Sequence, residues 1–378
     1  MKARTVAIMV VLLSLIVFLV LREEGRGTFG LVERLFLSWL AANAGHHNGL
    51  PPLTLVLYDE EASDLAGADE MAMLDAALFT RAASRLGALA AGVDGLHGDP
   101  ARMIEAARGM PVFGGFDLDD APGAGWTPMR GKAPAGWSEV PGLAARPGVF
   151  ARGFMSVPSG GGGSRSVLLA ARSADRPVPS FLVLAWCAAQ GMKSRDLAVE
   201  EGAISGPRGR LTVGPRGMMS FLPGVPAQVM NMNDLLVASE QFERTGGQSP
   251  MRGRVLVLAR ATSDVARVER DGVSPVTPAE LWAQSWEALS QGRLFVPAGW
   301  WFGPALVCVC SILALGSSRR SNHGAVIGGI FAVLVYLLVA LGAFAGARIF
   351  LPLGPALSAF LAAVVAGRAG YGAGWLGK

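Results

Sequence analysis

Residues 51–61 read PPLTLVLYDEE, and this stretch decides the class of fold. Two prolines precede a nearly continuous apolar run, and the run ends in three acidic residues. A short run of this kind is typical of a buried strand in a parallel sheet. Residues 69–92 then place apolar side chains at helical spacing, and residues 92–96 (GVDGL) predict a second strand. This strand–helix–strand order predicts a right-handed parallel unit and therefore an α/β domain.

Further elements are expected along the middle of the chain, interrupted by one long loop. Residues 100–109 and 110–117 predict another helix and strand, whereas residues 117–148 turn to Pro, Gly and Trp without periodicity. The later elements are expected as hairpin strands at 148–157 and 165–172, a helix at 177–191, strands at 208–214 and 217–224, a helix at 231–242, a strand at 253–262 and a helix at 279–292.

The expected hairpin between residues 148–157 and 165–172 has the glycine-rich tip PSGGGGS at 158–164. Consecutive glycines also occur in phosphate-binding loops, but there a helix follows at once, usually with Lys and Ser or Thr. Here a strand is expected instead. A flexible hairpin tip is therefore favoured over a phosphate cradle.

Apolar stretches at both ends of the chain predict membrane-spanning helices around this domain. Residues 6–21 are apolar or small and lack a signal-peptide cleavage site, so we expect an uncleaved anchor. The stretches 294–318, 321–347 and 349–367 contain no Asp, Glu, Lys or Arg, and each is long enough as a helix to cross roughly 30 Å of hydrocarbon. The expected parts are a cytoplasmic N-terminus (1–5), the anchor (6–21), an extracytoplasmic α/β domain (22–297), three further spans (298–318, 324–346 and 349–367) and a cytoplasmic tail (368–378).

The distribution of charge predicts the orientation in the membrane. Residues 22–297 have 26 basic and 29 acidic residues, whereas the rest of the chain has seven basic residues and no acidic one. Six of these seven lie at the N-terminus, in the Arg319–Arg320 loop or in the tail, and only Arg348 lies in the other short loop. By the positive-inside rule both termini are cytoplasmic, and the large domain is periplasmic or extracellular in a bacterial inner (cell) membrane. The net charge of +4 thus reflects topology, and nucleic-acid binding is not expected.

The three cysteines predict no disulfide within the outer domain. Only Cys187 belongs to that domain, while Cys308 and Cys310 lie in the expected second span. Two residues apart on a helix, Cys308 and Cys310 point in different directions, so packing is favoured over a redox or metal pair.

Several segments resemble a known sensory module when they are taken in order. LTLVLYDEE (53–61) ends a strand in acid, LGALAAGVDGLHGDP (86–100) leaves a strand into Asp94, and VPSFLVLAWCAAQ (178–190) is a helix led by Pro-Ser. NMNDLLVA (231–238) precedes MRGRVLVLARAT (251–262), and ELWAQSWEALSQGRLFVP (280–297) precedes a span. With the four-span frame, this order resembles the type-two CHASE sensory module, which is found on bacterial adenylate cyclases, histidine kinases and other signalling proteins.

The resemblance implies an extracytoplasmic ligand-sensing domain, and the chain departs from the family pattern in three places. ARATSD (259–264) stands where the family usually has a Gly-rich turn followed by a small residue and Asp, and Val-Thr-Pro (276–278) replaces the usual Gly before the last helix. The family's cytoplasmic output domain has no counterpart in this sequence. The resemblance therefore implies a sensory module that acts through another protein.

Three aspartates are candidate ligand-binding residues. Asp59, Asp94 and Asp264 each follow, or lie near, the carboxyl end of an expected strand, where open parallel sheets bind ligands. The resemblance favours Asp59 and Asp94 over Asp264. The alternative is that each Asp caps the next helix or turn.

No constellation of residues predicts an enzyme, a metal site or a cofactor. His46, His47 and His97 lie in expected loops, where solvated side chains are favoured over metal ligands. No Gly-x-Ser-x-Gly motif occurs, and the four histidines suggest no Ser-His-Asp arrangement. We therefore expect a protein without catalytic residues, bound metal or cofactor.

Glycines in the expected third span predict close helix packing. Gly324 and Gly328 form one Gly-x-x-x-Gly pair, and Gly342 and Gly346 form another on the same helix face. The face could pack within the chain's own bundle or form a homodimer. The function expected from the sequence is a membrane-anchored sensor or regulatory subunit that acts on a membrane or cytoplasmic output protein. The alternative is a structural scaffold subunit of a cell-envelope assembly.

Overall fold

The computed structural model forms two compact units. The helical unit comprises Met1–His47, Gly161–Ser164 and Phe295–Lys378, and the sheet unit comprises Asn48–Gly160 and Arg165–Leu294. The residues that the structure describes are 8, 11–12, 14–16, 28–44, 49–58, 68–95, 100–116, 127–140, 151–154, 165–200, 202–222, 228–260, 278–298, 305, 308–309, 322–354, 356–357 and 361.

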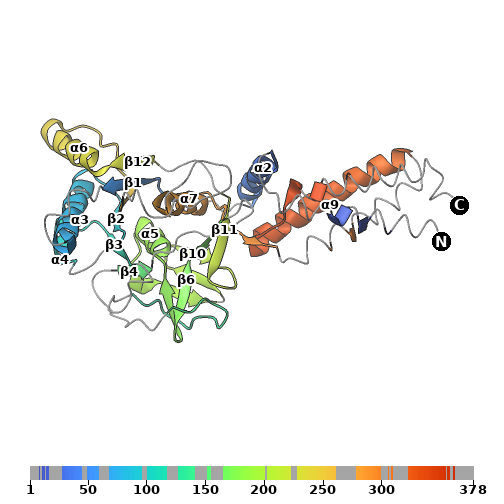
Figure 1. The fold of residues 1–378 in the computed structure, drawn as a ribbon, viewed down its shortest axis with the longest axis horizontal. Helices are drawn as coiled ribbons and strands as arrows, with labels where there is room; N and C mark the ends of the chain where they lie inside the picture. The colour runs from blue at the N-terminus through green and yellow to red at the C-terminus, as the bar shows by residue number, and fades with distance from the viewer. Residues whose placement is uncertain are drawn as a thin grey trace. The chain divides into compact units, whose positions relative to one another are not determined.

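A fully parallel sheet of six strands forms the centre of the sheet unit (Figure 1). β1 (Leu53–Tyr58) pairs with β12 on one side and with β13 on the other. The first four residues of β1 are buried, which confirms the expected buried strand and the α/β class with a parallel sheet. The order across the sheet is β12 (Gln228–Asn231), β1, β13 (Val255–Arg260), β2 (Ala90–Val93), β3 (Val112–Phe116) and β4 (Ala151–Phe154).

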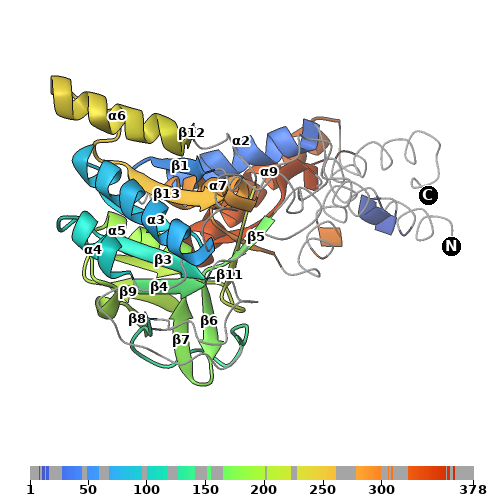
Figure 2. The ribbon, with the colours of Figure 1, turned by 60° about the vertical axis from the view of Figure 1, so that its left-hand side comes forward.

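One face of this sheet is covered by three helices, which Figure 2 shows beside the strands. They are α3 (Ala68–Arg85), α4 (Ala101–Ala106) and α6 (Met232–Thr245). Their apolar sides share a core with alternate residues of the strands, because successive strand residues point to opposite faces. The core under these helices includes Val56, Phe79, Ala83, Ala91, Val93, Met103, Leu235, Leu256 and Leu258.

The opposite face is covered by α5 (Phe181–Ala189) and α7 (Pro278–Ser290). A row of buried rings joins this layer, with Phe113 of β3 at 4.8 Å from Phe181 and Phe181 at 5.1 Å from Trp282 of α7. The indole N–H of Trp286 donates a hydrogen bond to the carbonyl oxygen of Pro51 (3.1 Å) and so ties α7 to the start of β1. The sheet unit therefore has three layers, helices–sheet–helices.

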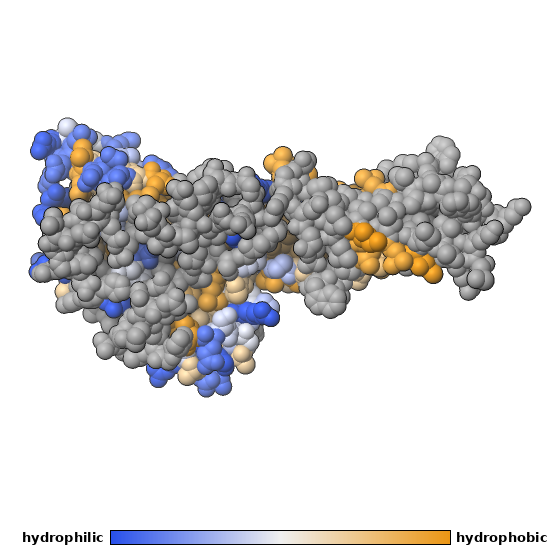
Figure 3. Space-filling model, viewed as in Figure 1, coloured by the Kyte–Doolittle hydropathy of each residue, from blue (hydrophilic) through white to orange (hydrophobic). Residues whose placement is uncertain are grey.

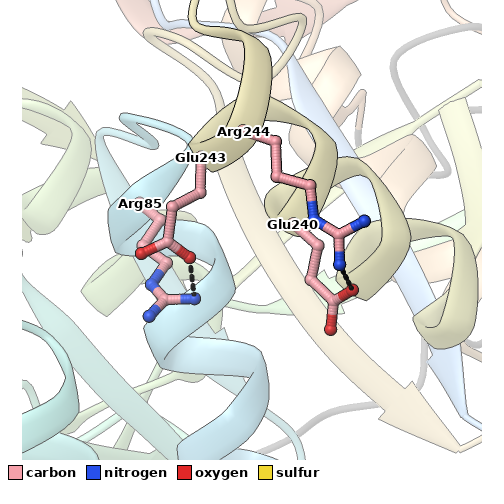
Figure 4. Close-up of polar contacts among 4 residues, drawn as sticks. All are labelled: Arg85, Glu240, Glu243 and Arg244. Atoms are coloured by element: carbon pink, nitrogen blue, oxygen red, sulfur yellow. Dashed lines mark ion pairs between the residues drawn. The ribbon is translucent and has the colours of Figure 1, made fainter.

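Exposed ion pairs add little to the packing of α6 (Figure 4). Arg85 of α3 lies 2.8 Å from Glu243 of α6, and within α6 Arg244 lies 3.9 Å from Glu240. The carboxylates and Arg244 are largely exposed, and such pairs contribute about 1 kcal/mol or less. The apolar core beneath α3 and α6 is thus the main attachment.

The chain from β5 to β11, which follows β4 and precedes β12 in the sequence, forms small antiparallel sheets. β5 pairs with β11, β6 pairs with β7, and β8, β9 and β10 form a three-stranded sheet. The bounds are β5 (Arg165–Leu168), β6 (Ala170–Ser173), β7 (Arg176–Pro179), the 3-10 helix η2 (Ser194–Asp196), β8 (Ala198–Glu200), β9 (Ala203–Gly206), β10 (Gly209–Thr212) and β11 (Met218–Phe221).

The hairpin expected between 148–157 and 165–172 is wrong for the described residues. β4 instead pairs in parallel with β3, and the second segment divides into β5 and β6. The division has a local cause, because the carbonyl oxygen of Gly217 accepts hydrogen bonds from the N–H groups of both Leu169 and Ala170. β5 and β6 can then pair with different strands. The glycine-rich segment 158–164 lies outside the described residues.

In the helical unit, α2 (Thr28–Asn43) packs against α9 (Asn322–Ala347). α9 ends where Arg348 adopts a left-handed conformation (φ 56°), and the chain continues into β15 (Ile349–Phe350). β15 pairs in parallel with β14 (Val296–Pro297), and the ring of Phe350 lies 4.8 Å from Phe295. A strand pair thus lies beside the helices.

The helical unit exposes an apolar surface (Figure 3). Of the 17 exposed large hydrophobic side chains among the described residues, 13 belong to this unit. They form stripes at helical spacing on α2 and α9, and helical residues near the N-terminus carry a third stripe. No helix within the described residues is both long enough and apolar enough to cross a membrane. The exposed side chains of the unit are Ile8, Leu12, Ile16, Leu31, Leu35, Trp39, Val309, Phe331, Leu334, Val335, Leu338, Val339 and Leu361.

Candidate functional site

The carboxyl ends of all six parallel strands meet at one edge of the sheet. Asp94 lies at this edge, directly after β2. Its backbone N–H donates to the carbonyl oxygen of Leu258 in the neighbouring β13 (3.0 Å). Asp94 thus lies at the end of a strand, as expected, although β2 spans Ala90–Val93 rather than the expected 92–96.

The strands that precede the three candidate aspartates are neighbours in the sheet. Asp59 follows the last residue of β1, and Asp264 follows the end of β13 by four residues; both lie outside the described residues. β13 lies between β1 and β2, with Tyr58 level with Arg260. The segments that contain Asp59, Asp264 and Asp94 therefore begin next to one another, at the carboxyl ends of β1, β13 and β2.

This stretch is also where the direction of the connections changes. β1 leads to α3 and β2 leads to α4 on one face of the sheet, whereas β13 leads to α7 on the other face. Adjacent strands whose connections leave toward opposite faces mark a topological switch point, where ligands of open parallel sheets bind. The carboxyl end of β13 is therefore the candidate site.

The segments that continue from this edge are strongly acidic. After β1, β2, β3 and β13, the sequence segments 59–67, 94–99, 117–126 and 261–277 together contain 12 acidic and two basic residues. The sequence from 127 to 222, which includes the antiparallel strands β5 to β11, has the opposite composition, with 12 basic and five acidic residues. Segments of this composition favour cationic or hydrogen-bond-donating ligands over anions.

The other candidate residues form no site within the described part of the chain. His46, His47, His97 and Cys310 lie outside it. No group of three or more His, Cys, Asp or Glu side chains able to hold a metal ion is found among the residues that are described. Cys187 is buried, and burial, followed by the charge of Asp196, raises the pKa of its thiol to about 12. That thiol is therefore in its unreactive protonated form.

The four helix-packing glycines all lie on α9, as predicted. A Cβ atom added at Gly342 or Gly346 would meet no atom within 4 Å. These two glycines are thus not in close contact with another described part of this chain. The sequence left two alternatives for this glycine face, packing within the chain's own bundle and contact in a homodimer. The surroundings of Gly342 and Gly346 do not support the first.

One polar residue of the helical unit was not singled out from the sequence. The Glu33 carboxylate accepts hydrogen bonds from the backbone N–H groups of Leu353 (3.1 Å) and Gly354 (2.7 Å). The sequence does contain a signal for Glu33, because it is a charged residue on the apolar stripe of α2. Phe36, Leu37 and Leu40 follow it by three, four and seven residues.

Comparisons with known proteins identify no relative of this chain. The chain matches no protein-family model, no curated protein and no solved structure.

Proposed function

We propose that the protein is a membrane-anchored sensor or regulatory subunit whose sheet unit binds a ligand outside the cytoplasm. The observation that supports the proposal is the switch point at β13, where the strands that precede Asp59, Asp94 and Asp264 in the sequence lie side by side. Asp94 contributes a carboxylate at the edge. The acidic composition of the sequence segments that follow the strands favours a cationic or hydrogen-bond-donating ligand.

A membrane setting is supported by the sequence and by the exposed surface of the helical unit. The stretches 294–318, 321–347 and 349–367 carry no charged residue, and α9 exposes Phe331, Leu334 and Leu338. Water disfavours such a surface, so lipid or another protein is the expected cover. With the positive-inside pattern, both termini lie in the cytoplasm and the sheet unit lies in the periplasm or outside the cell.

The output of this sensor is proposed to lie in a partner protein. The resemblance to the type-two CHASE module supports a role in signal transduction, and no residue of the chain is proposed as catalytic. Ligand binding would act on the partner through the membrane segments, which requires that the ligand favour one of two arrangements.

The second candidate is a scaffold subunit of an envelope assembly. The exposed stripe of α9 and the glycines Gly342 and Gly346, which no other described residue covers, favour it. A helix face of this kind suits permanent packing against other subunits or a second copy. A scaffold requires no ligand at the sheet edge.

The test begins with the full chain purified in lipid nanodiscs. We expect a cationic metabolite or divalent cation, screened at millimolar concentration, to raise the melting temperature of the wild type. Asp94→Asn should lose this shift, because the substitution removes one charge at the edge. Glu240→Gln is the matched control, since Glu240 is exposed on α6 and belongs to no candidate site.

Three results would contradict the proposal in different ways. An equal shift in wild type and Asp94→Asn rejects the site, and no shift with any compound favours the scaffold. Reporter fusions at Lys378 and in the Arg319–Arg320 loop should be active only as cytoplasmic reporters. An exported C-terminus would reject the membrane orientation.

A further inference from the structure

A single carboxylate ties α2 to a helical segment that is distant in the sequence. Oε2 of Glu33 accepts a hydrogen bond from the N–H of Leu353 (3.1 Å), and Oε1 accepts one from the N–H of Gly354 (2.7 Å). These are the first helical residues after β15, so neither N–H has a partner within its own helix. The contact joins the helix that precedes β1 in the sequence to residues more than 300 positions later.

Glu33 lies on the apolar face of α2. Phe36, Leu37 and Leu40 follow it at helical spacing and are all buried, and the ring of Phe36 lies 6.2 Å from Phe350. A carboxylate in such surroundings is costly to ionise, and two N–H groups offset only part of that cost. Burial accordingly raises the pKa of Glu33 to about 7, although the hydrogen bonds from Gly354 and Leu353 lower it.

Few other charged or titratable groups belong to the elements packed here. Arg34 is exposed on α2, and Tyr336 and Arg348 come from α9 and the turn after it. The remaining group on α9 is His323, whose side chain lies outside the described residues. No ion pair to Glu33 is found among the residues that the structure describes.

We propose that Glu33 is a proton-sensitive latch between α2 and the helical segment that begins at Leu353. The neutral carboxyl group favours the packed arrangement. When its proton passes to solvent, the half-buried charge favours separation of the two segments. The latch does not depend on the proposed sensor function, because all of its groups belong to the helical unit.

The direction of the pH effect follows from linkage. Glu33 has an ordinary pKa of 4.5 when it is separated and a pKa of about 7 when it is packed, so the packed arrangement binds the proton more tightly. The stabilisation is full below pH 4.5, falls as the pH rises from 4.5 to about 7, and changes little at higher pH. Between pH 5.5 and 8.5, the ratio of separated to packed forms should rise roughly thirtyfold.

Hydrogen exchange of the full chain in nanodiscs tests this proposal. The protection of peptides covering residues 349–357 would be measured from pH 5.5 to 8.5 and corrected for the intrinsic exchange rate at each pH. We expect the wild type to lose protection by roughly thirtyfold, with most of the loss between pH 5.5 and 7 and little further change above pH 7. Glu33→Gln, which cannot ionise, should show constant protection across the same range.

Two controls separate the latch from a general effect of pH. Arg34→Gln changes the charge beside Glu33 without removing the contact, and it should keep the wild-type profile. Peptides of β13 should keep constant protection, because they belong to the sheet unit. If Glu33→Gln fails to fold, the wild-type profile alone decides. Constant protection of 349–357, or protection that increases with pH, overturns the proposal.

Discussion

Replacing Gly92 with Ala would place a methyl group inside the aromatic layer of the sheet unit. Gly92 lies in β2, and a Cβ atom there would be 2.6 Å from two ring carbons of Phe113 and 2.8 Å from Cζ of Phe181. Carbon atoms pack comfortably at about 3.5–4.0 Å, so both rings would have to move by roughly 1 Å. Neither has free space, because both are fully buried and Phe181 also contacts Trp282.

The expected loss of stability follows from these contacts. Overpacking of a core costs about 1–3 kcal/mol, and the stiffer unfolded chain of an alanine variant returns about 0.4–1 kcal/mol. We therefore expect Gly92→Ala to lower the free energy of unfolding by about 2 kcal/mol. For a unit of this size, the melting temperature should fall by about 4–8 °C.

Thermal unfolding of the full chain in nanodiscs measures this change, and a second substitution identifies its cause. Phe113→Leu removes the two ring carbons nearest to the added methyl group. In the Phe113→Leu background, Gly92→Ala should therefore cost clearly less than in the wild type. A shift of less than about 1 °C, or an equal cost in both backgrounds, would refute the reasoning.

Other residues of the sheet unit give smaller and independent effects. Cys187 should resist alkylation at pH 8 in the folded chain and react after denaturation, since burial raises the pKa of its thiol to about 12; rapid labelling of the folded chain would contradict this. Ser180→Ala should destabilise the unit by about 1 kcal/mol, because the hydroxyl accepts the N–H of Val183 at the start of α5; an unchanged urea midpoint would count against the cap. Arg85→Ala should cost about 1 kcal/mol or less, since its partner Glu243 is mostly exposed, and a larger loss of melting temperature would mean that the pair is worth more than its exposure indicates.

Local patterns predicted most elements of the sheet unit but not their order. The apolar runs at 53–58 and 255–260 could be recognised as buried strands because they are short and bounded by turn residues. Their pairing left no local signal, since the partner strands are about 200 residues apart. The same limit explains why the expected hairpin was wrong, because β5 pairs with β11 across some 50 residues.

For the candidate site, too, the sequence predicted single residues but not the strand pairing that brings them close. GVDGL indicated a strand close to Asp94, although β2 ends at Val93, just before it. The insertion of β13 between β1 and β2, which creates the switch point, depends on tertiary pairing. The partners of Glu33 were also beyond sequence patterns, because backbone N–H groups at a helix start carry no side-chain signature.

The position of β1 has a consequence for how the protein is made. β1 is the first strand of the sheet to leave the ribosome, yet both of its neighbours, β12 and β13, are synthesised last. At about 5–20 residues per second, the apolar segment LTLVLY waits roughly 10–40 s for a partner. Throughout that time it has two open hydrogen-bonding edges, which is the condition under which nascent strands aggregate. The sheet unit should therefore depend on a chaperone during biosynthesis, and a premature stop before residue 255 should yield an insoluble product rather than a smaller folded domain.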